Sequence, residues 1–165
     1  MGRCPETSTR QTLRHIYTAE IGVREFTGHN DGARVQEYLQ YVNLRGNFSY
    51  CGAFVCWNLG KAGINNPKNG WAPALFPANR VIWTRNTATD RGVIKIGDVF
   101  GIYFSELKRI GHCGFVDQWD GTWCITVEGN TSNPIRAGPS AQGVYKKKRL
   151  IKTIYQVADW ITTKK

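Results

Sequence analysis

The chain is organised around the stretch Phe48-Ser49-Tyr50-Cys51-Gly52-Ala53-Phe54-Val55-Cys56-Trp57-Asn58-Leu59. Turn-forming residues (Arg45-Gly46-Asn47) come before it. After Cys51 the apolar residues recur at helical spacing, as Ala53, Phe54, Trp57, Leu59 and Ala62. This pattern predicts a helix that has Cys51 in or just before its first turn and that stops near Gly63.

The predicted position of Cys51 changes the chemistry of its thiol. Unpaired backbone N–H groups at a helix start, together with the helix dipole, favour negative charge, so a thiol there ionises more easily than one in solution. The thiolate is the nucleophilic form. From this stretch alone, a small buried cysteine with only a packing role is an equal alternative, and the rest of the chain has to distinguish the two.

Length and composition predict an ordinary soluble globular protein. The 165 residues, 41% hydrophobic and 21% charged, suit one domain over residues 1–165 with a sizeable core. No apolar run approaches the roughly 20 residues that a membrane helix needs, so no membrane span is expected. The polar segment 1–7 lacks the apolar centre of a secretory signal. We therefore expect synthesis in the cytoplasm without a signal peptide.

The chain is strongly basic, with 22 Lys and Arg against 12 Asp and Glu and a net charge of +10. Such a charge favours an anionic partner, which nucleic acid, a membrane surface or an anionic cell wall would each supply. The basic residues crowd toward the C-terminus, as Lys146, Lys147, Lys148, Arg149, Lys152, Lys164 and Lys165. This cluster is either a solvated face or a contact surface. No sequence signature of a nucleic-acid-binding fold accompanies it.

The five cysteines indicate reduced thiols. Their number is odd and no CxxC pair occurs, so neither a disulfide framework nor a zinc site is suggested. The set Cys51, Cys56, His112 and Cys113 matches no standard zinc spacing. Adjacent His112 and Cys113 would also point to opposite faces of a strand. No metal and no cofactor is predicted.

The order of elements predicts an α+β domain. A first helix would run from Thr7 or Ser8 to near Gly22, and a second would start at Asn30 or Asp31 and include Val42. An irregular connection over 65–79 follows the Cys51 helix. Strands are then predicted over 93–104, with a break at Gly97-Asp98, and over 112–119, 123–128, 144–151 and 153–157. Helices followed by strands indicate helices packed on an antiparallel sheet of about five to six strands.

A cysteine nucleophile needs a base, and the base needs a third group that holds its tautomer. His112 is the only histidine of the predicted sheet, and Glu128 is the natural third group. A two-residue loop at Asp120-Gly121 would turn Glu128 away from His112. A three-residue loop closed by Trp119 and Trp123, or a bulge, would place Glu128 diagonal to His112 on the same face. Both registers are open, and catalysis requires the second.

Four motifs occur along the chain in one order. They are Tyr50-Cys51-Gly52-Ala53-Phe54-Val55-Cys56-Trp57, Gly97-Asp98-Val99, Gly111-His112-Cys113-Gly114-Phe115-Val116 and Val127-Glu128-Gly129-Asn130-Thr131. Together they resemble the CHAP domain family (cysteine, histidine-dependent amidohydrolases/peptidases), peptidoglycan hydrolases related to the NlpC/P60 group with a papain-like core. The segments 20–25 and 29–32 are similar to the N-terminal part of a bacterial and phage subset of such proteins. The resemblance covers roughly residues 10 to 135.

The resemblance implies a role for each matching residue. Cys51 would be the nucleophile and contribute its N–H to the oxyanion hole, and His112 would be the base. Glu128 would orient His112, and Asn130 would give further polar support. Two residues depart from the family pattern, namely Gly52 after the nucleophile and Cys113 after the histidine. No acidic Asp-x-Asp loop of the kind that binds calcium in some relatives is present, so no metal is implied.

The implied activity is hydrolysis of an amide bond in the peptide part of bacterial peptidoglycan. The enzyme would be an N-acetylmuramoyl-L-alanine amidase or an endopeptidase, and a monomer is expected. It would act at the cell wall as a phage endolysin released through a holin, or as a secreted antibacterial effector, which would need an immunity protein. The alternatives are a papain-like deamidase or transglutaminase acting on protein, and a non-enzymatic basic domain that binds wall or nucleic acid.

Overall fold

The computed structural model describes residues 5–87, 94–135, 138 and 141–162. Three helices come first: α1 (Pro5–Ala19), α2 (Ala33–Tyr41) and α3 (Cys51–Lys61). A short 3-10 helix, η1 (Ala72–Leu75), follows. The strands are β1 (Val81–Thr84), β2 (Val99–Phe104), β3 (Arg109–Trp119), β4 (Trp123–Ser132), β5 (Gln142–Leu150) and β6 (Gln156–Ala158).

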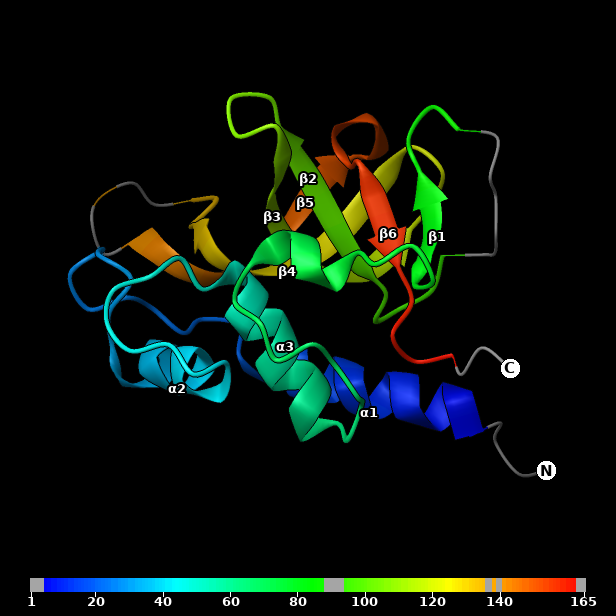
Figure 1. Cartoon of the computed structure of the whole chain (residues 1–165). Helices are drawn as coiled ribbons and strands as arrows, with labels where there is room; N and C mark the ends of the chain where they lie inside the picture. The colour runs from blue at the N-terminus through cyan, green and yellow to red at the C-terminus, as the bar shows by residue number, and fades with distance from the viewer. Residues whose placement is uncertain (1–4, 88–93, 136–137, 139–140, 163–165) are drawn as a thin grey trace.

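The strands form one six-stranded sheet in the order β1-β6-β2-β3-β4-β5. Every neighbouring pair is antiparallel. The three α-helices lie together on one side of the sheet (Figure 1). The predicted α+β class with an antiparallel sheet of five to six strands is therefore confirmed.

Several element boundaries differ from the prediction. The first helix starts at Pro5, which suits a first helical position, and ends at Ala19. The second helix starts after Gly32 because Asp31 instead accepts hydrogen bonds from the backbone and hydroxyl of Thr27. Part of the predicted 153–157 strand is a 3-10 turn, Ile151–Thr153, before β6. The strand β1 was not predicted. Val93, predicted to start a strand, lies outside the described residues.

Two apolar clusters hold the layers together. On the helix side, the Tyr17 ring stacks on Phe115 at 4.7 Å between centroids, and Phe54 meets Phe115 edge-on at 6.0 Å, so α1 and α3 both pack on β3. A second cluster has the buried members Ile82, Phe100, Val116, Cys124, Ile154 and Val157. Partly buried Trp83 of β1 and Trp119 of β3 pack against this cluster with their ring centroids 5.4 Å apart. Two strands separate β1 from β3, so the sheet must curl around this second cluster.

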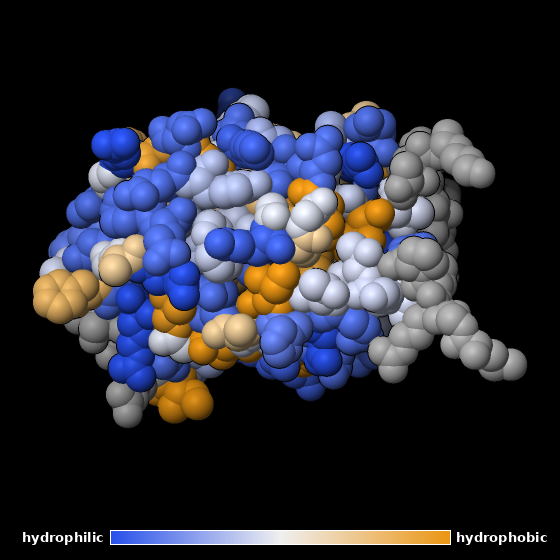
Figure 2. Space-filling model, turned by 90° about the horizontal axis from the view of Figure 1, so that it is seen from below, coloured by the Kyte–Doolittle hydropathy of each residue, from blue (hydrophilic) through white to orange (hydrophobic). Residues whose placement is uncertain are grey.

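The surface on the helix side is mainly hydrophilic, and α3 is buried along its whole run from Cys51 to Leu59. Viewed from the helix side, hydrophilic residues cover most of the molecule and hydrophobic ones show in smaller areas between them (Figure 2). Within the described ranges, no helix has both the length and the apolar character needed to cross a bilayer.

Arg10 ties α1 to two distant parts of the chain. Its side chain is almost fully buried, with Nη1 2.8 Å from Asp98 Oδ1 and Nη2 3.0 Å from Asp159 Oδ2. Nη1 also donates to the carbonyl oxygen of Ile96 at 2.9 Å. The guanidinium therefore joins the first helix, the entry to β2 and the segment after β6.

Replacing Arg10 with Met should lower the free energy of unfolding by about 3–5 kcal/mol, because two buried carboxylates lose their counter-charge. Urea unfolding followed by circular dichroism measures this loss. Lys95→Met is the matched control, since its exposed pair with Glu6 (2.8 Å) should contribute under ~1 kcal/mol. Equal losses in the two variants would show that the buried network does not stabilise the fold.

Candidate active site

Cys51 is the first residue of α3, as predicted, and is 5% exposed. Tyr50 precedes it as the N-cap residue and gives no side-chain cap to the helix. No side chain at the cap therefore accepts from the first-turn N–H groups of the helix. These groups could donate to an anion that develops beside Cys51.

Gly52, the residue after Cys51, has a steric cause. A Cβ at Gly52 would lie 2.5 Å from the carbonyl oxygen of Gly70. The backbone of the connection between α3 and η1 therefore crosses directly over the first turn of α3. Only glycine leaves room for that crossing, which accounts for this departure from the family pattern.

His112 of β3 and Glu128 of β4 meet on the sheet. His112 Nε2 lies 2.8 Å from Glu128 Oε2, and the side chains are 12% and 0% exposed. An ionised carboxylate can only accept, so Nε2 carries the proton and Nδ1 is the nitrogen left for Cys51. The carboxylate thus fixes the tautomer that a base toward Cys51 requires.

A bulge in the β3–β4 pair brings these two residues together. Near the turn Trp119 pairs with Cys124, a register that would turn Glu128 to the face opposite His112. The register shifts between Val116 and Gln118, so that Phe115 pairs with Val127. Three residues, 120–122, lie between the strands, but Trp119 pairs with Cys124 and not with Trp123, so the predicted alternative of a bulge is the one that occurs.

Gly114 opens the path between the two side chains. It lies between His112 and Val116 in the two-residue alternation of β3, on the same face. A Cβ at Gly114 would lie 3.1 Å from Glu128 Cγ and 2.7 Å from the carbonyl oxygen of Val127. The Glu128 side chain therefore passes over the bare backbone of Gly114 to reach His112.

The Cys51 thiol interacts with the side chains of both Cys113 and His112. Hydrogen bonding to Cys113 is the largest effect on the pKa of Cys51, and hydrogen bonding to His112 and the charge of His112 add to it. Together they hold this pKa well below its usual value, although burial would raise it. Burial alone would lower the pKa of His112, but its hydrogen bonds with Cys51 and Glu128 outweigh this and raise it to about 9. Both shifts favour the form in which a thiolate lies beside an imidazolium.

Cys113 lies next to His112 on β3 and also interacts with Cys51. The two residues were predicted to point to opposite faces of the strand, and their surroundings differ accordingly: Cys113 belongs to the helix-side cluster, and the His112 ring lies 6.3 Å from that of Phe100, a member of the second cluster. The pairing of β3 with β2 is irregular here, because His112 pairs with Ile102 but Ile110 pairs with Tyr103, which leaves Gly111 as an extra residue. The start of α3 meets β3 beside this irregularity, where both side chains reach it.

Arg149 of β5 is the site residue that sequence analysis missed. Its Nε and Nη2 lie 2.5 Å from Oε1 and 2.6 Å from Oε2 of Glu128, and Thr126 Oγ1 also donates to Oε1. Burial would raise the pKa of Glu128, but the hydrogen bonds from Arg149 and His112 hold it far below its usual value. The sequence could have indicated Arg149, because alternation along the predicted strand places Arg149 and Lys148 on opposite faces of the sheet.

Asn130 supports the loop before Cys51. Its Oδ1 accepts the N–H of Tyr50 at 3.2 Å, and its Nδ2 donates to Asn30 Oδ1 at 2.8 Å. Buried Glu25 braces the same loop, because it accepts from the Tyr50 hydroxyl at 3.1 Å and from the Asn30 N–H at 2.9 Å. The predicted polar support therefore acts on the backbone beside Cys51, and Glu25 belongs to it.

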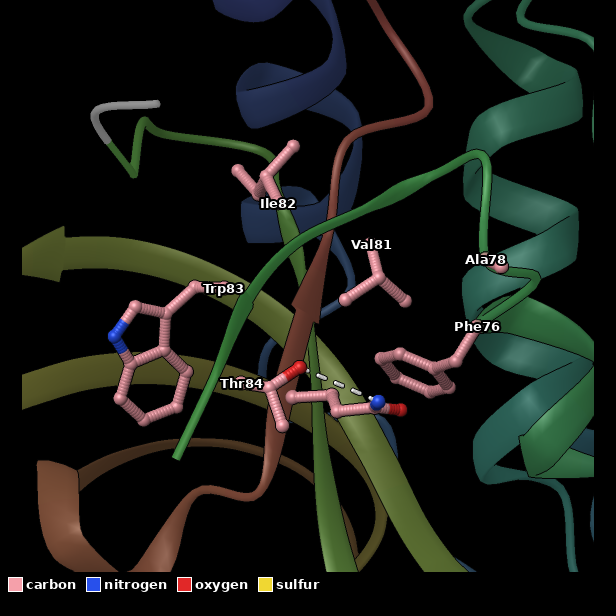
Figure 3. Close-up of a pocket in the computed structure, with 7 residues that line it drawn as sticks. Phe76, Ala78, Val81, Ile82, Trp83 and Thr84 are labelled. Carbon is pink, nitrogen blue, oxygen red and sulfur yellow. Dashed lines mark hydrogen bonds between the residues drawn. The ribbon is translucent and has the colours of Figure 1, made fainter. Parts of the chain in front are cut away.

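A hollow lies beside the edge strand β1 (Figure 3). It is lined by Phe76, Ala78, Val81, Ile82, Trp83, Thr84 and Gln156. Gln156 Nε2 donates to Thr84 Oγ1 at 3.4 Å across it. The Phe76 ring packs on Gly101, which pairs with Cys113, so one wall of the hollow adjoins the site.

Within the described residues, no group of three or more His, Cys, Asp or Glu side chains is arranged to hold a metal ion. No known family model matches the chain, and no curated protein sequence matches it significantly.

Replacing Cys113 with Val should raise the pKa of Cys51, because the thiolate loses the hydrogen bond that lowers it most. Iodoacetamide alkylation of Cys51 from about pH 5 to about pH 10, located by fragment mass spectrometry, measures the midpoint. Cys113→Ser keeps a donor and should retain the wild-type midpoint. A Val variant that alkylates like wild type at every pH would remove Cys113 from the site.

Proposed function

We propose that this chain is a cysteine amidase or endopeptidase that hydrolyses an amide bond in the peptide part of bacterial peptidoglycan. The observation that carries the proposal is that Cys51, at the start of a helix, interacts with His112, whose Nε2 lies 2.8 Å from Glu128 Oε2. These are the residues that the resemblance to the CHAP family assigns to catalysis. Helices packed on one side of an antiparallel sheet are compatible with a papain-like core.

The proposed reaction is acyl transfer to water. The Cys51 thiolate attacks the amide carbonyl, and the N–H groups at the start of α3 stabilise the resulting oxyanion. His112 gives its proton to the leaving amine, which leaves a thioester on Cys51. His112 then takes a proton from water, which attacks the thioester and releases the acid and the free thiolate. Glu128 keeps the imidazole oriented through both steps.

The charge of the protein supports a wall substrate. Six of its acidic residues are buried, namely Glu20, Glu25, Asp98, Asp117, Glu128 and Asp159. The solvent therefore meets mainly the basic residues of a +10 chain, which would concentrate it on anionic wall polymers in a salt-sensitive way. As a phage endolysin or a secreted antibacterial effector it would act at the cell wall, and an effector would need an immunity protein in the cell that makes it.

Digestion of purified sacculi, with mass spectrometry of the released fragments, tests the function and identifies the bond cut. Cys51→Ala should lower the rate by at least about a thousandfold, because the nucleophile is lost. The control is Cys56→Ala, since burial raises the pKa of that thiol to about 11 and its Sγ donates to the carbonyl oxygen of Asn69 at 3.5 Å. Intact sacculi with the wild-type enzyme, but deamidation or crosslinking of a glutamine-containing protein, would favour a papain-like deamidase or transglutaminase instead.

The rate should fall above a pH of about 9, where His112 loses the proton that the leaving amine needs. An ordinary imidazole would place this loss near its unperturbed pKa of about 6.5. Initial rates of sacculus clearing from about pH 5 to about pH 10 locate the basic limb. A basic limb near neutrality would mean that His112 is not held as an imidazolium.

A further inference from the structure

Glu128 is held on every side by its neighbours. Oε1 accepts from Thr126 Oγ1 and Arg149 Nε, and Oε2 accepts from Arg149 Nη2 and His112 Nε2. Each oxygen thus accepts two hydrogen bonds, which fills its lone pairs. Resting on the function proposed above, we propose that Arg149 is the positioning residue of the site, holding Glu128 in the one orientation in which Oε2 accepts from His112.

The geometry of the Arg149 contact exceeds that of an ordinary surface ion pair. The side chains of Arg149 and Glu128 are 23% and 0% exposed, and two parallel N–H groups meet the two carboxylate oxygens. A planar fork of this kind fixes both the plane and the rotation of the carboxylate, which a single point charge cannot do. The direction left to Oε2 is the one that leads to His112.

Arg149 also keeps Glu128 charged when His112 is not. During the reaction the imidazole alternates between imidazolium and neutral forms. Without Arg149, a neutral His112 would leave a buried carboxylate with no cation bonded to it, and burial favours its protonation. A protonated Glu128 would no longer hold the imidazole as a carboxylate does. Because Arg149 is always charged, Glu128 stays ionised whether or not His112 carries its second proton.

The other charged or titratable groups around Glu128 cannot take over this role. Lys147 of β5 acts on Glu128 through its charge alone, and its Nζ reaches Ser132 Oγ at 3.4 Å. The thiols of Cys113 and Cys124 have pKa values raised by their surroundings and are neutral near neutral pH. His112 is the group being positioned.

The test is the pH dependence of Cys51 alkylation in Arg149→Met, because it needs no substrate. We expect the thiolate midpoint to rise by about one pH unit, so that alkylation below it slows about tenfold. Lys148→Met is the control: it removes a charge from the next position of β5, where Nζ lies 4.4 Å from the Trp123 ring centroid, and should keep the wild-type midpoint. A lower melting temperature with an unchanged midpoint would give Arg149 a structural role only and overturn the proposal.

A double-mutant cycle separates action through Glu128 from a direct effect. In the Glu128→Gln background, Arg149→Met should shift the midpoint little further, and a full additional shift would contradict the proposal. If Arg149→Met does not fold, Arg149→Lys carries the test, because it keeps the charge but loses the fork and should shift the midpoint in the same direction. A wild type that alkylates as expected but leaves sacculi intact would refute the peptidoglycan substrate and leave the role of Arg149 measurable.

Discussion

The contact between His112 and Glu128 depends on a single irregularity of the sheet. In regular strands the register set at the 120–122 turn would place these residues on opposite faces. The bulge near Asp117 reverses this between the turn and the site. Asp117 itself is anchored by Arg14 Nε at 2.7 Å and by the Tyr17 hydroxyl at 2.9 Å, both from α1. The first helix therefore fixes the place where the register of the sheet changes.

Buried charge recurs throughout this protein, and each instance joins separate elements. Arg10 links α1 to the entry of β2, Arg14 links α1 to β3, and Arg149 links β5 to β4. Ion pairs of this kind are costly to form and costlier to break, so they restrict the chain to the arrangement that satisfies all of them. The ion pair between Arg149 and Glu128 therefore has two effects: it joins β5 to β4, and it keeps the carboxylate next to His112 ionised and oriented.

The predicted helix at Cys51, the α+β class and the antiparallel sheet followed from local patterns, and the structure agrees with them. The strand β1 was missed because its four residues lie just after a Pro-rich connection, and their pairing with β6 depends on a segment 70 or more residues later. Asn130 was predicted only as polar support, and its partner could not be named from the sequence: its positive φ of 57° marks the bulge between β4 and β5, where the side chain turns toward Tyr50. Long-range pairing decided both cases.

The sequence by itself determined which groups are available: a cysteine at a helix start, one histidine and one glutamate on predicted adjacent strands, and a strongly basic chain. These follow from residue type and from periodicities of two and 3.6, which act over a few neighbours. Tertiary structure alone decided that a bulge turns Glu128 toward His112, that Cys113 reaches the Cys51 thiol, and that Arg149 holds the carboxylate. The physical reason is that strand register and buried ion pairing join residues far apart in the chain, and no local preference specifies them.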